Sequence, residues 1–358
     1  MASRGRRRFL QWGLAGAAAA WRGGASRAGE KPPEGRVAED KAVAGKLPEG
    51  KMPMRRLGRT GVDVSLVGLA DVETAQAVDE QTATRIIHAA IDHGINFMDN
   101  CWDYNDGKSH LWMGRALGGG YRKRAFLMTK IDGRTRSAAA AQIDQSLRDL
   151  GTDAIDLMQV HEVIRGTDPD RVFGPDGAME AIVAAKKAGK IRFIGFTGHK
   201  SPRIHLKMLD VAAAHHFPFD TVQMPVNVMD AHRDSFERLV MPAATTAGVA
   251  VLAMKPLGSG VFFKSGPLAL KRVSAVECLR YSMGSAASVV ITGCQSMRDL
   301  AQALEAAYKA PAMNEEERKV VLARTAPAGT DGQWEKYKVS DMFDGTARNP
   351  HWLESAKL

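Results

Sequence analysis

The sequence predicts an α/β fold, a (β/α)8 barrel preceded by a short N-terminal β-hairpin. From Met54 onward, short runs rich in strand-forming residues alternate eight times with longer segments of helical period. The 358-residue chain is 45% hydrophobic, which is enough to bury a large core. The alternative is an open, doubly wound sheet, which would carry a glycine-rich dinucleotide turn after its first strand. That turn reads Gly68-Leu69-Ala70-Asp71 and lacks the pattern.

The predicted elements follow in a regular order. The hairpin consists of Arg55–Leu57 and Val62–Val64, with Gly58 and Gly61 between them. The predicted strands are Ser65–Leu69, Asn96–Asp99, Phe126–Thr129, Asp156–Val160, Arg192–Gly195, Thr221–Met224, Val249–Met254 and Val289–Thr292. The predicted helices span residues 79–93, 109–117, 136–150, 177–188, 201–214, 235–247, 273–283 and 297–309. The first helix carries its apolar side chains on one stripe and ends at Gly94.

Residues 1–28 have the layout of an export signal. Arg6-Arg7-Arg8-Phe9-Leu10 precedes a short, weakly apolar run and then small residues, an order that resembles the bacterial twin-arginine signal. The prediction is export by the twin-arginine machinery to the periplasm or cell envelope. A disordered basic tail on a cytoplasmic protein is the alternative. Residues 29–53 are predicted to form a flexible linker, residues 54–310 the barrel, and residues 311–358 a C-terminal extension packed on it.

Composition excludes several classes of function. Residues 1–53 hold 11 Lys and Arg against 5 Asp and Glu, so most of the net charge of +9 lies there. The rest of the chain has no basic stripe interleaved with aromatics, so no nucleic-acid partner is expected. Cys101, Cys278 and Cys294 are far apart and match neither a metal site nor a disulfide framework. No later segment is apolar over the roughly 20 residues that a membrane span needs, so stable insertion of the mature form is not expected.

Polar side chains stand at the ends of three consecutive predicted strands. Asp99 ends the second strand and Tyr104 follows it, while Lys130 and His161 directly follow the third and fourth strands. In a (β/α)8 barrel the active site is built at these strand ends. Taken singly, the residues are also compatible with ordinary structural roles: an Asp99–Lys130 salt bridge, a core histidine and a loop tyrosine. Taken together, they predict a catalytic site.

The same residues lie in longer motifs that resemble the aldo-keto reductase family. These are Gly94–Asp99 with Tyr104, Leu127–Lys130, and Asp156–His161, supported by the segments Leu147–Asp156, Gly189–Gly195 and Arg56–Gly61. The resemblance extends over roughly residues 54–310. It implies a nicotinamide-dependent oxidoreductase that acts on aldehydes or ketones, with sugar-derived carbonyls among the candidates.

The resemblance also implies a role for each catalytic residue. Tyr104 is the general acid and base, although a free tyrosine has a pKa of about 10. A nearby cation lowers that value, and Lys130, held by Asp99, is the expected cation. His161 is expected to hydrogen-bond the substrate oxygen and orient it. The nicotinamide supplies the hydride.

The expected cofactor, NADP(H) or NAD(H), would lie over the last four strands. The corresponding positions are Thr197, Gly198, Gln223, Met254, Lys255, Pro256, Leu257, Gly293, Gln295 and Asp299. Gln223 matches the family glutamine, whereas Gly198 replaces an asparagine and Met254 replaces a stacking tyrosine. Asp299 stands where NADP-preferring members have an arginine, and an acidic residue suits a free ribose hydroxyl better than a phosphate. The choice between the two nucleotides stays open.

Two alternative functions are compatible with these departures from the family pattern. The first is a non-catalytic nucleotide-binding barrel that serves as a redox sensor or partner platform. The second is a structural barrel without a ligand. No cysteine follows Cys294, so the iron–sulfur cluster of some family members is not expected. Trp102 and Trp112 are candidates for lining the substrate pocket.

Overall fold

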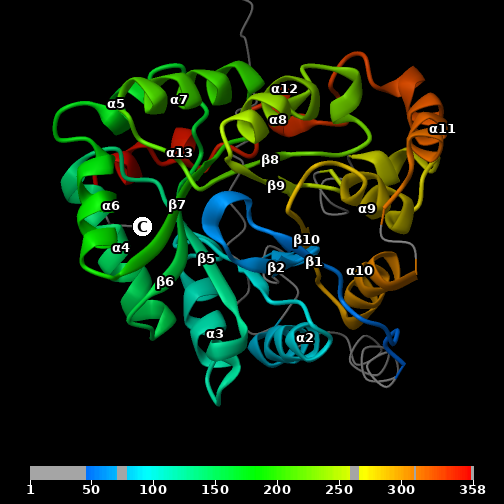
Figure 1. Ribbon diagram of the computed structural model, residues 1–358, viewed down its shortest axis with the longest axis horizontal. Coiled ribbons are helices and arrows are strands. Elements are labelled where there is room, and N and C mark those ends of the chain that lie inside the picture. The colour runs from blue at the N-terminus through cyan, green and yellow to red at the C-terminus, as the bar shows by residue number, and fades with distance from the viewer. Residues whose placement is uncertain (1–45, 71–78, 259–265, 310–311, 356–358) are drawn as a thin grey trace, which may run out of the picture. The chain divides into compact units, whose positions relative to one another are not determined.

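The computed structural model describes residues 46–70, 79–258, 266–309 and 312–355. Within these ranges, eight parallel strands close into a barrel in the order β10-β3-β4-β5-β6-β7-β8-β9. The ring closes where β10 pairs with β3, with Val290 opposite Val67. Helices surround the strands, as Figure 1 shows. The predicted barrel and its N-terminal hairpin are therefore confirmed.

The strands are short, as expected for a barrel of this class. The hairpin pairs β1 (Met54–Arg56) with β2 (Asp63–Ser65) in antiparallel orientation. The barrel strands are β3 (Val67–Ala70), β4 (Phe97–Asp99), β5 (Phe126–Ile131), β6 (Ile155–Val160), β7 (Ile191–Thr197), β8 (Thr221–Pro225), β9 (Ala250–Met254) and β10 (Val289–Gly293).

Helices connect the strands and continue beyond the last one. They are α2 (Glu80–Asp92), α3 (Lys108–Ala116), α4 (Arg136–Leu150), α5 (Asp168–Phe173), α6 (Ala178–Lys187), α7 (Pro202–Ala214), α8 (Phe236–Thr246), α9 (Ala275–Met283), α10 (Met297–Lys309), α11 (Glu315–Thr325), α12 (Lys336–Val339) and α13 (Gly345–Arg348). Their ends follow capping rules. In α4, the Thr135 hydroxyl accepts the Ala138 N–H, and Gly151 ends the helix with a φ of 58°.

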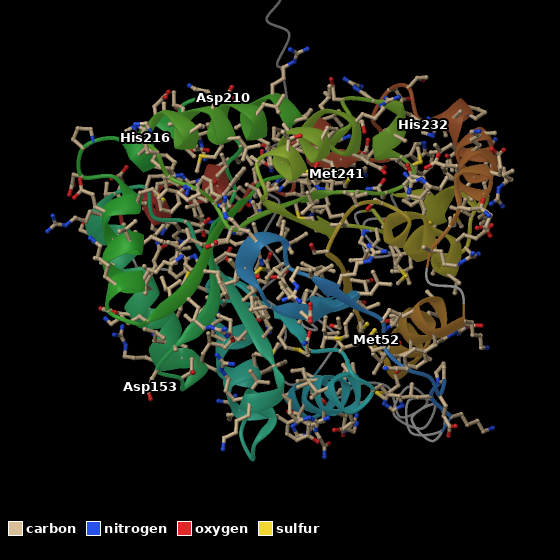
Figure 2. All side chains as sticks on the ribbon, in the orientation of Figure 1. Met52, Asp153, Asp210, His216, His232 and Met241 are labelled. Carbon is tan, nitrogen blue, oxygen red and sulfur yellow. The ribbon has the colours of Figure 1, made fainter. Side chains whose placement is uncertain are left out.

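The barrel strands are flanked by two layers of apolar core, and Figure 2 labels Met52 and Met241 of the outer layer. The larger lies between strands and helices, where α2 buries the predicted stripe, including Ile86, Ile87 and Ile91. The smaller fills the barrel interior, where the rings of Phe97 and Phe126 stack at 5.1 Å. Hairpin residues Leu57 and Val64 join the inner layer. The N-terminal half of the barrel is therefore packed, and only the other end is available for chemistry.

Two element predictions need correction. The first barrel strand begins at Val67 and not at Ser65, because Ser65 ends the hairpin and its hydroxyl donates to the Val67 carbonyl at 2.6 Å. The same hydroxyl accepts the Asn96 N–H at 3.0 Å, which fixes the bend between hairpin and barrel. Helix α5 was not predicted, and neither were α11, α12 and α13.

The predicted export signal, residues 1–28, lies outside the described residues, as does most of the predicted linker, residues 29–53. In the part of the chain that is described, no helix is both long and apolar enough to cross a membrane.

Candidate active site

The polar residues predicted at the strand ends meet at the C-terminal mouth of the barrel. Asp99 ends β4, Lys130 lies in β5, His161 follows β6 and Gln223 lies in β8. All four are buried, and the largest exposed fraction is 8%, for His161. Because the strands are parallel, their C-terminal ends point to one side of the barrel.

A buried ion pair lies at the centre of this group. The Lys130 ammonium donates to one carboxylate oxygen of Asp99 and, at 2.8 Å, to the Asn100 carbonyl. The Gln223 amide donates to the other Asp99 oxygen at 2.7 Å. Burial alone lowers the pKa of Lys130, but the charge and hydrogen bond of Asp99, together with Cys101 and Asp103, outweigh it and raise the net pKa. Lys130 is therefore a fixed cation at neutral pH.

Tyr104 reaches this cation from the loop after β4. Asn105 and Asp106 have φ angles of 52° and 53°, so the loop turns sharply directly after the tyrosine. The Lys130 ammonium lies 4.9 Å from the centre of the Tyr104 ring. The His161 ring stands edge-on to the tyrosine, with 6.0 Å between ring centres. The structure thus brings all four predicted catalytic residues into one group.

Asp132 is a further member of the group that the sequence interpretation missed. Its carboxylate lies 3.0 Å from His161 Nδ1 and accepts the Trp102 indole N–H at 2.6 Å. Burial lowers the pKa of His161, but the charge of Asp132 and its hydrogen bond reverse the effect and raise it. A carboxylate can only accept, so Nδ1 carries the proton and Nε2 is left for a ligand. Asp132 comes two residues after Lys130, the spacing that keeps side chains on one face of a strand.

Arg134 fixes the backbone behind this histidine. The buried guanidinium donates to the carbonyls of Asp132 at 2.7 Å, His161 at 2.7 Å and Glu162 at 2.9 Å, and to the Asp168 carboxylate at 3.1 Å. Glu162 has a φ of 44°, a conformation that non-glycine residues adopt only when the surroundings hold them there. His161 therefore sits on a rigid support.

Cys101, Asp103 and His161 form the group of possible metal ligands found among the described residues, with their ligand atoms within 4.8 Å of one another. Burial raises the pKa of Asp103 to about 6 and that of the Cys101 thiol well above its usual value. The thiol lies 3.4 Å from His161 Nδ1. That nitrogen carries a proton where it faces Asp132, so it offers no lone pair to a metal ion. The arrangement fits a hydrogen-bonded cluster better than a metal centre.

Residues 335–355, the C-terminal segment, pack against the loops at this end of the barrel. Asp344 lies 3.0 Å from Nε2 of His199, which follows β7. The N–H groups of Gly345 and Thr346 donate to the Glu162 carboxylate at 2.8 and 2.7 Å. In Figure 1 the red α13 lies near β7. The C-terminal segment therefore contributes to the surroundings of the catalytic group.

Comparison with known proteins decides the family. The sequence model of the aldo/keto reductase family matches residues 66–310, more than half of the chain. The chain belongs to the aldo/keto reductase family. It is thereby placed among NAD(P)H-dependent carbonyl oxidoreductases.

Its relatives are distant. The chain is 29% identical over 247 residues to the uncharacterized oxidoreductase YrpG of Bacillus subtilis, covering 62% of this chain and 73% of the relative. It is 28% identical over 225 residues to the 6-dehydroglucose reductase of Novosphingobium aromaticivorans, covering 58% and 69%. The holo form of aldo-keto reductase AKR11C1 from Bacillus halodurans matches with a TM-score of 0.65 and 23% identity, over 79% of this chain and all of that one. This last likeness concerns the fold alone.

Of the positions where the family is expected to hold the nicotinamide, this chain keeps the glutamine in β8 and changes the asparagine after β7. The Gln223 side-chain oxygen is buried and has no hydrogen-bond partner among the described residues. A buried acceptor without a donor costs about 1–3 kcal/mol, and a nicotinamide carboxamide carries the donor it lacks. Gly198 leaves no room for the family's asparagine, because a Cβ there would lie 2.4 Å from the Val163 carbonyl oxygen. The buried oxygen of Gln223 thus fits a carboxamide donor, whereas position 198 has no room for an asparagine side chain.

The end of β9 supplies apolar surface beside these positions. The Thr197 hydroxyl points to the Met254 sulfur at 4.0 Å, so the end of β7 contacts that of β9. Met254 is partly exposed, whereas Pro256 is buried and Leu257 packs against the core. The methionine therefore presents a soft apolar face where the family has a tyrosine ring.

The last predicted cofactor positions lie at the start of α10. Gly293 is exposed, and the Gln295 N–H donates to the Asp299 carboxylate at 2.9 Å. The Asp299 N–H in turn donates to the Ser296 hydroxyl at 3.2 Å. A carboxylate thus occupies the helix end that would otherwise favour a phosphate.

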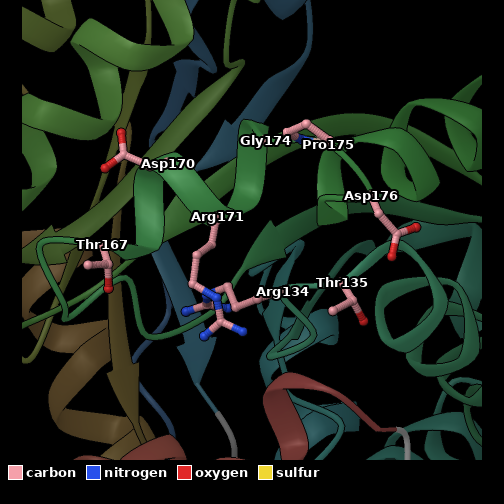
Figure 3. A pocket seen from close by; sticks show the side chains of 8 residues that line it. All are labelled: Arg134, Thr135, Thr167, Asp170, Arg171, Gly174, Pro175 and Asp176. Carbon is pink, nitrogen blue, oxygen red and sulfur yellow. The ribbon is translucent and has the colours of Figure 1, made fainter.

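A surface pocket of about 440 Å³ lies around α5, beside the Arg134 guanidinium that supports His161 (Figure 3). It is lined by Arg134, Thr135, Thr167, Asp170, Arg171, Gly174, Pro175 and Asp176. Three of its charges are already paired: Arg134 with Asp168, Arg171 with Glu354 and Asp170 with Lys207. None of the four predicted catalytic residues lines it, so the catalytic group is the better candidate for the active site.

Proposed function

We propose that this protein reduces aldehydes or ketones with a nicotinamide nucleotide, and that Tyr104 donates the proton. The observation that carries the proposal is the buried Lys130–Asp99 pair beside the Tyr104 ring. The nicotinamide, when bound, supplies the hydride. The residues of the chain must therefore bind the carbonyl, orient it and deliver a proton to its oxygen.

Lys130 and His161 have different roles in this reaction: Lys130 acts on the acid, and His161 acts on the carbonyl oxygen. The fixed charge of Lys130 favours the phenolate of Tyr104 over the phenol, which makes the hydroxyl a stronger acid. Asp99 holds the ammonium and is itself held by Gln223. Asp132 faces His161 Nδ1, and the raised pKa of His161 favours the imidazolium, in which Nε2 also carries a proton that it can donate to the carbonyl oxygen. Both contacts stabilise charge that develops on that oxygen.

The residues at the start of α10 support NAD(H) over NADP(H). The Asp299 carboxylate takes the Gln295 N–H, and its negative charge repels a 2′-phosphate. A free ribose hydroxyl, by contrast, is a donor that a carboxylate can accept.

The names of two relatives support a sugar-derived substrate. One is a 6-dehydroglucose reductase and another, 28% identical over 238 residues, is the L-galactose dehydrogenase of Arabidopsis thaliana. We therefore include oxidised sugars among the candidate substrates, beside simple aldehydes and ketones.

The test begins with fluorescence titration of the full-length chain with NADH and NADPH, followed by a carbonyl screen. Tyr104→Phe should lower kcat by about 10²- to 10⁴-fold, the usual contribution of a general acid, and leave nucleotide binding intact. Tyr121→Phe is the matched control, since its hydroxyl donates to the exposed Asp92 side chain. Full activity of Tyr104→Phe contradicts the mechanism. Nucleotide binding without turnover of any carbonyl favours the non-catalytic redox sensor or partner platform instead.

A further inference from the structure

Lys255, one of the predicted cofactor positions, is a second cation at the mouth of the barrel, and the proposed proton transfer does not use it. It directly follows β9 and has a φ of 56°, in the left-handed region that a lysine seldom adopts. The Asn227 amide donates to its carbonyl at 3.1 Å and to the Tyr337 hydroxyl at 2.9 Å. The backbone at Lys255 is therefore held in place, and this fixes the direction in which the side chain leaves it.

The Lys255 ammonium lies beside two rings of the C-terminal segment that pack edge to face, with 6.3 Å between their centres. It is 5.4 Å from the Tyr337 ring centre and 5.2 Å from the Phe343 ring centre. Among the described residues it has no hydrogen bond and no ion pair. The side chain keeps partial contact with solvent, yet burial lowers its pKa to about 8.

The neighbouring charges do not compensate this ammonium. Glu162 and Asp99 attract it electrostatically, and Lys130 repels it. Both carboxylates are already engaged, because Asp99 binds Lys130 and Gln223, while Glu162 accepts three hydrogen bonds from Gly345 and Thr346. Contact with ring faces stabilises a cation less than burial destabilises it. Because this buried positive charge has no carboxylate partner, an anionic ligand would stabilise it.

We infer that Lys255, walled by Tyr337 and Phe343, binds a carboxylate carried by the carbonyl substrate. The inference rests on the proposed function, because it names the class of substrate for that site. The walls come from residues 337 and 343, beyond the region 66–310 that the family shares. The cofactor is common to the family, so a subsite completed outside the shared region serves what differs between members, the substrate.

The experiment compares two aldehydes that differ only at the anionic group: 4-carboxybenzaldehyde and methyl 4-formylbenzoate. The wild-type protein should prefer the carboxylate. Lys255→Met should lower kcat/KM for the carboxylate by about 10- to 100-fold relative to the ester, the usual loss for a hydrogen bond to a charged group. Lys255→Arg should retain most of the preference. Lys108→Met, which removes an exposed lysine at the start of α3 at the same end of the barrel, should not change it.

A second measurement separates a binding role from a structural one. Removing an unpaired, largely buried charge should leave the melting temperature of Lys255→Met equal to or above that of the wild type. A lower melting temperature with an unchanged ratio of kcat/KM values would mean that Lys255 only anchors the rings, and would overturn the inference. Equal losses on both aldehydes with weaker NADH or NADPH binding would place the ammonium on the nucleotide, and would also overturn it.

Failure of the proposed function is distinguishable from failure of this inference. If the wild type reduces neither aldehyde, the reductase assignment for this substrate class fails. Binding of 4-methylbenzoate, measured by calorimetry with nucleotide present, then tests the subsite without turnover. Binding by the wild type that is lost in Lys255→Met supports the subsite, and no binding by the wild type overturns it.

Discussion

Replacing Asp132 with asparagine perturbs the histidine without touching the other catalytic residues. The Asp132 carboxylate serves two donors, His161 Nδ1 at 3.0 Å and Trp102 Nε1 at 2.6 Å. An asparagine offers one acceptor and one donor, so one of these two N–H groups must face an NH2 group. The substitution therefore removes the charge and also leaves one donor unsatisfied.

The magnitude follows from the charge and its burial. Losing a hydrogen bond to a charged group costs about 1.5–3 kcal/mol. If this loss falls on the transition state, kcat/KM drops by about 10- to 150-fold. The pKa of His161 should fall, because Asp132 is the largest factor that raises it, with Asp103 and Glu162 contributing less.

Steady-state kinetics across pH and an NMR titration of His161 provide the assay. A raised histidine pKa stabilises the fold below the unfolded value of about 6.5, and the contribution is lost as pH rises through the folded pKa. Asp132→Asn should therefore lower the free energy of unfolding more at about pH 6 than at about pH 9. Trp102→Phe is the control, since it leaves the carboxylate charge in place. An unchanged His161 pKa together with kcat/KM within about twofold of wild type would refute the reasoning.

Three further predictions concern the other parts of the site. Asp299→Asn keeps the acceptor for the Gln295 N–H but removes the charge, so the Kd for NADPH should improve by about 2- to 5-fold relative to that for NADH in a fluorescence titration. Gly198→Ala places a Cβ against the Val163 carbonyl and should lower the free energy of unfolding by about 1–3 kcal/mol. Gly166→Ala, with no atom within 4 Å of its Cβ, should be nearly neutral in the same denaturation assay. The preference for 4-carboxybenzaldehyde should fall about tenfold per pH unit above about pH 8, where Lys255 loses its proton, and a flat profile contradicts the role given to it.

The sequence predicted the barrel because the signals for it are local. Alternation of strand-forming runs with helical stripes and the glycines at helix ends needs no tertiary information. Helix α2 buries the residues that its spacing indicated, including Ile86 and Ile91. Ser65 was misplaced because its hydroxyl bonds across to Asn96, a contact 31 residues away that no local pattern contains. Helices α11 to α13 follow the last βα unit, so the alternation of strands and helices could not predict them.

The residues of the candidate site show the same difference between local signals, which the sequence contains, and tertiary contacts, which it does not. Asp99, Tyr104, Lys130 and His161 were found because each lies at a strand end within a motif. Asp132 was missed because its partner, His161, directly follows the next strand, and only the parallel register of β5 and β6 brings the two together. The obstacle at Gly198 is a carbonyl from the loop after β6, which the sequence does not place. The roles given to these residues, and the export signal, stay predictions that the experiments must decide.

The two lysines at the mouth show why stability and function are separable in this barrel. The Lys130 ammonium is bound by the Asp99 carboxylate and the Asn100 carbonyl, and its pKa is raised. Its charge therefore stabilises the folded structure. Lys255 has two rings and a lowered pKa, so its charge opposes the folded structure. Removing Asp99 should therefore destabilise the protein, because it leaves the charge of Lys130 buried and unpaired. Removing the charge of Lys255 should not destabilise the protein. Because the fold does not need this charge, we attribute its presence to the binding of an anionic ligand.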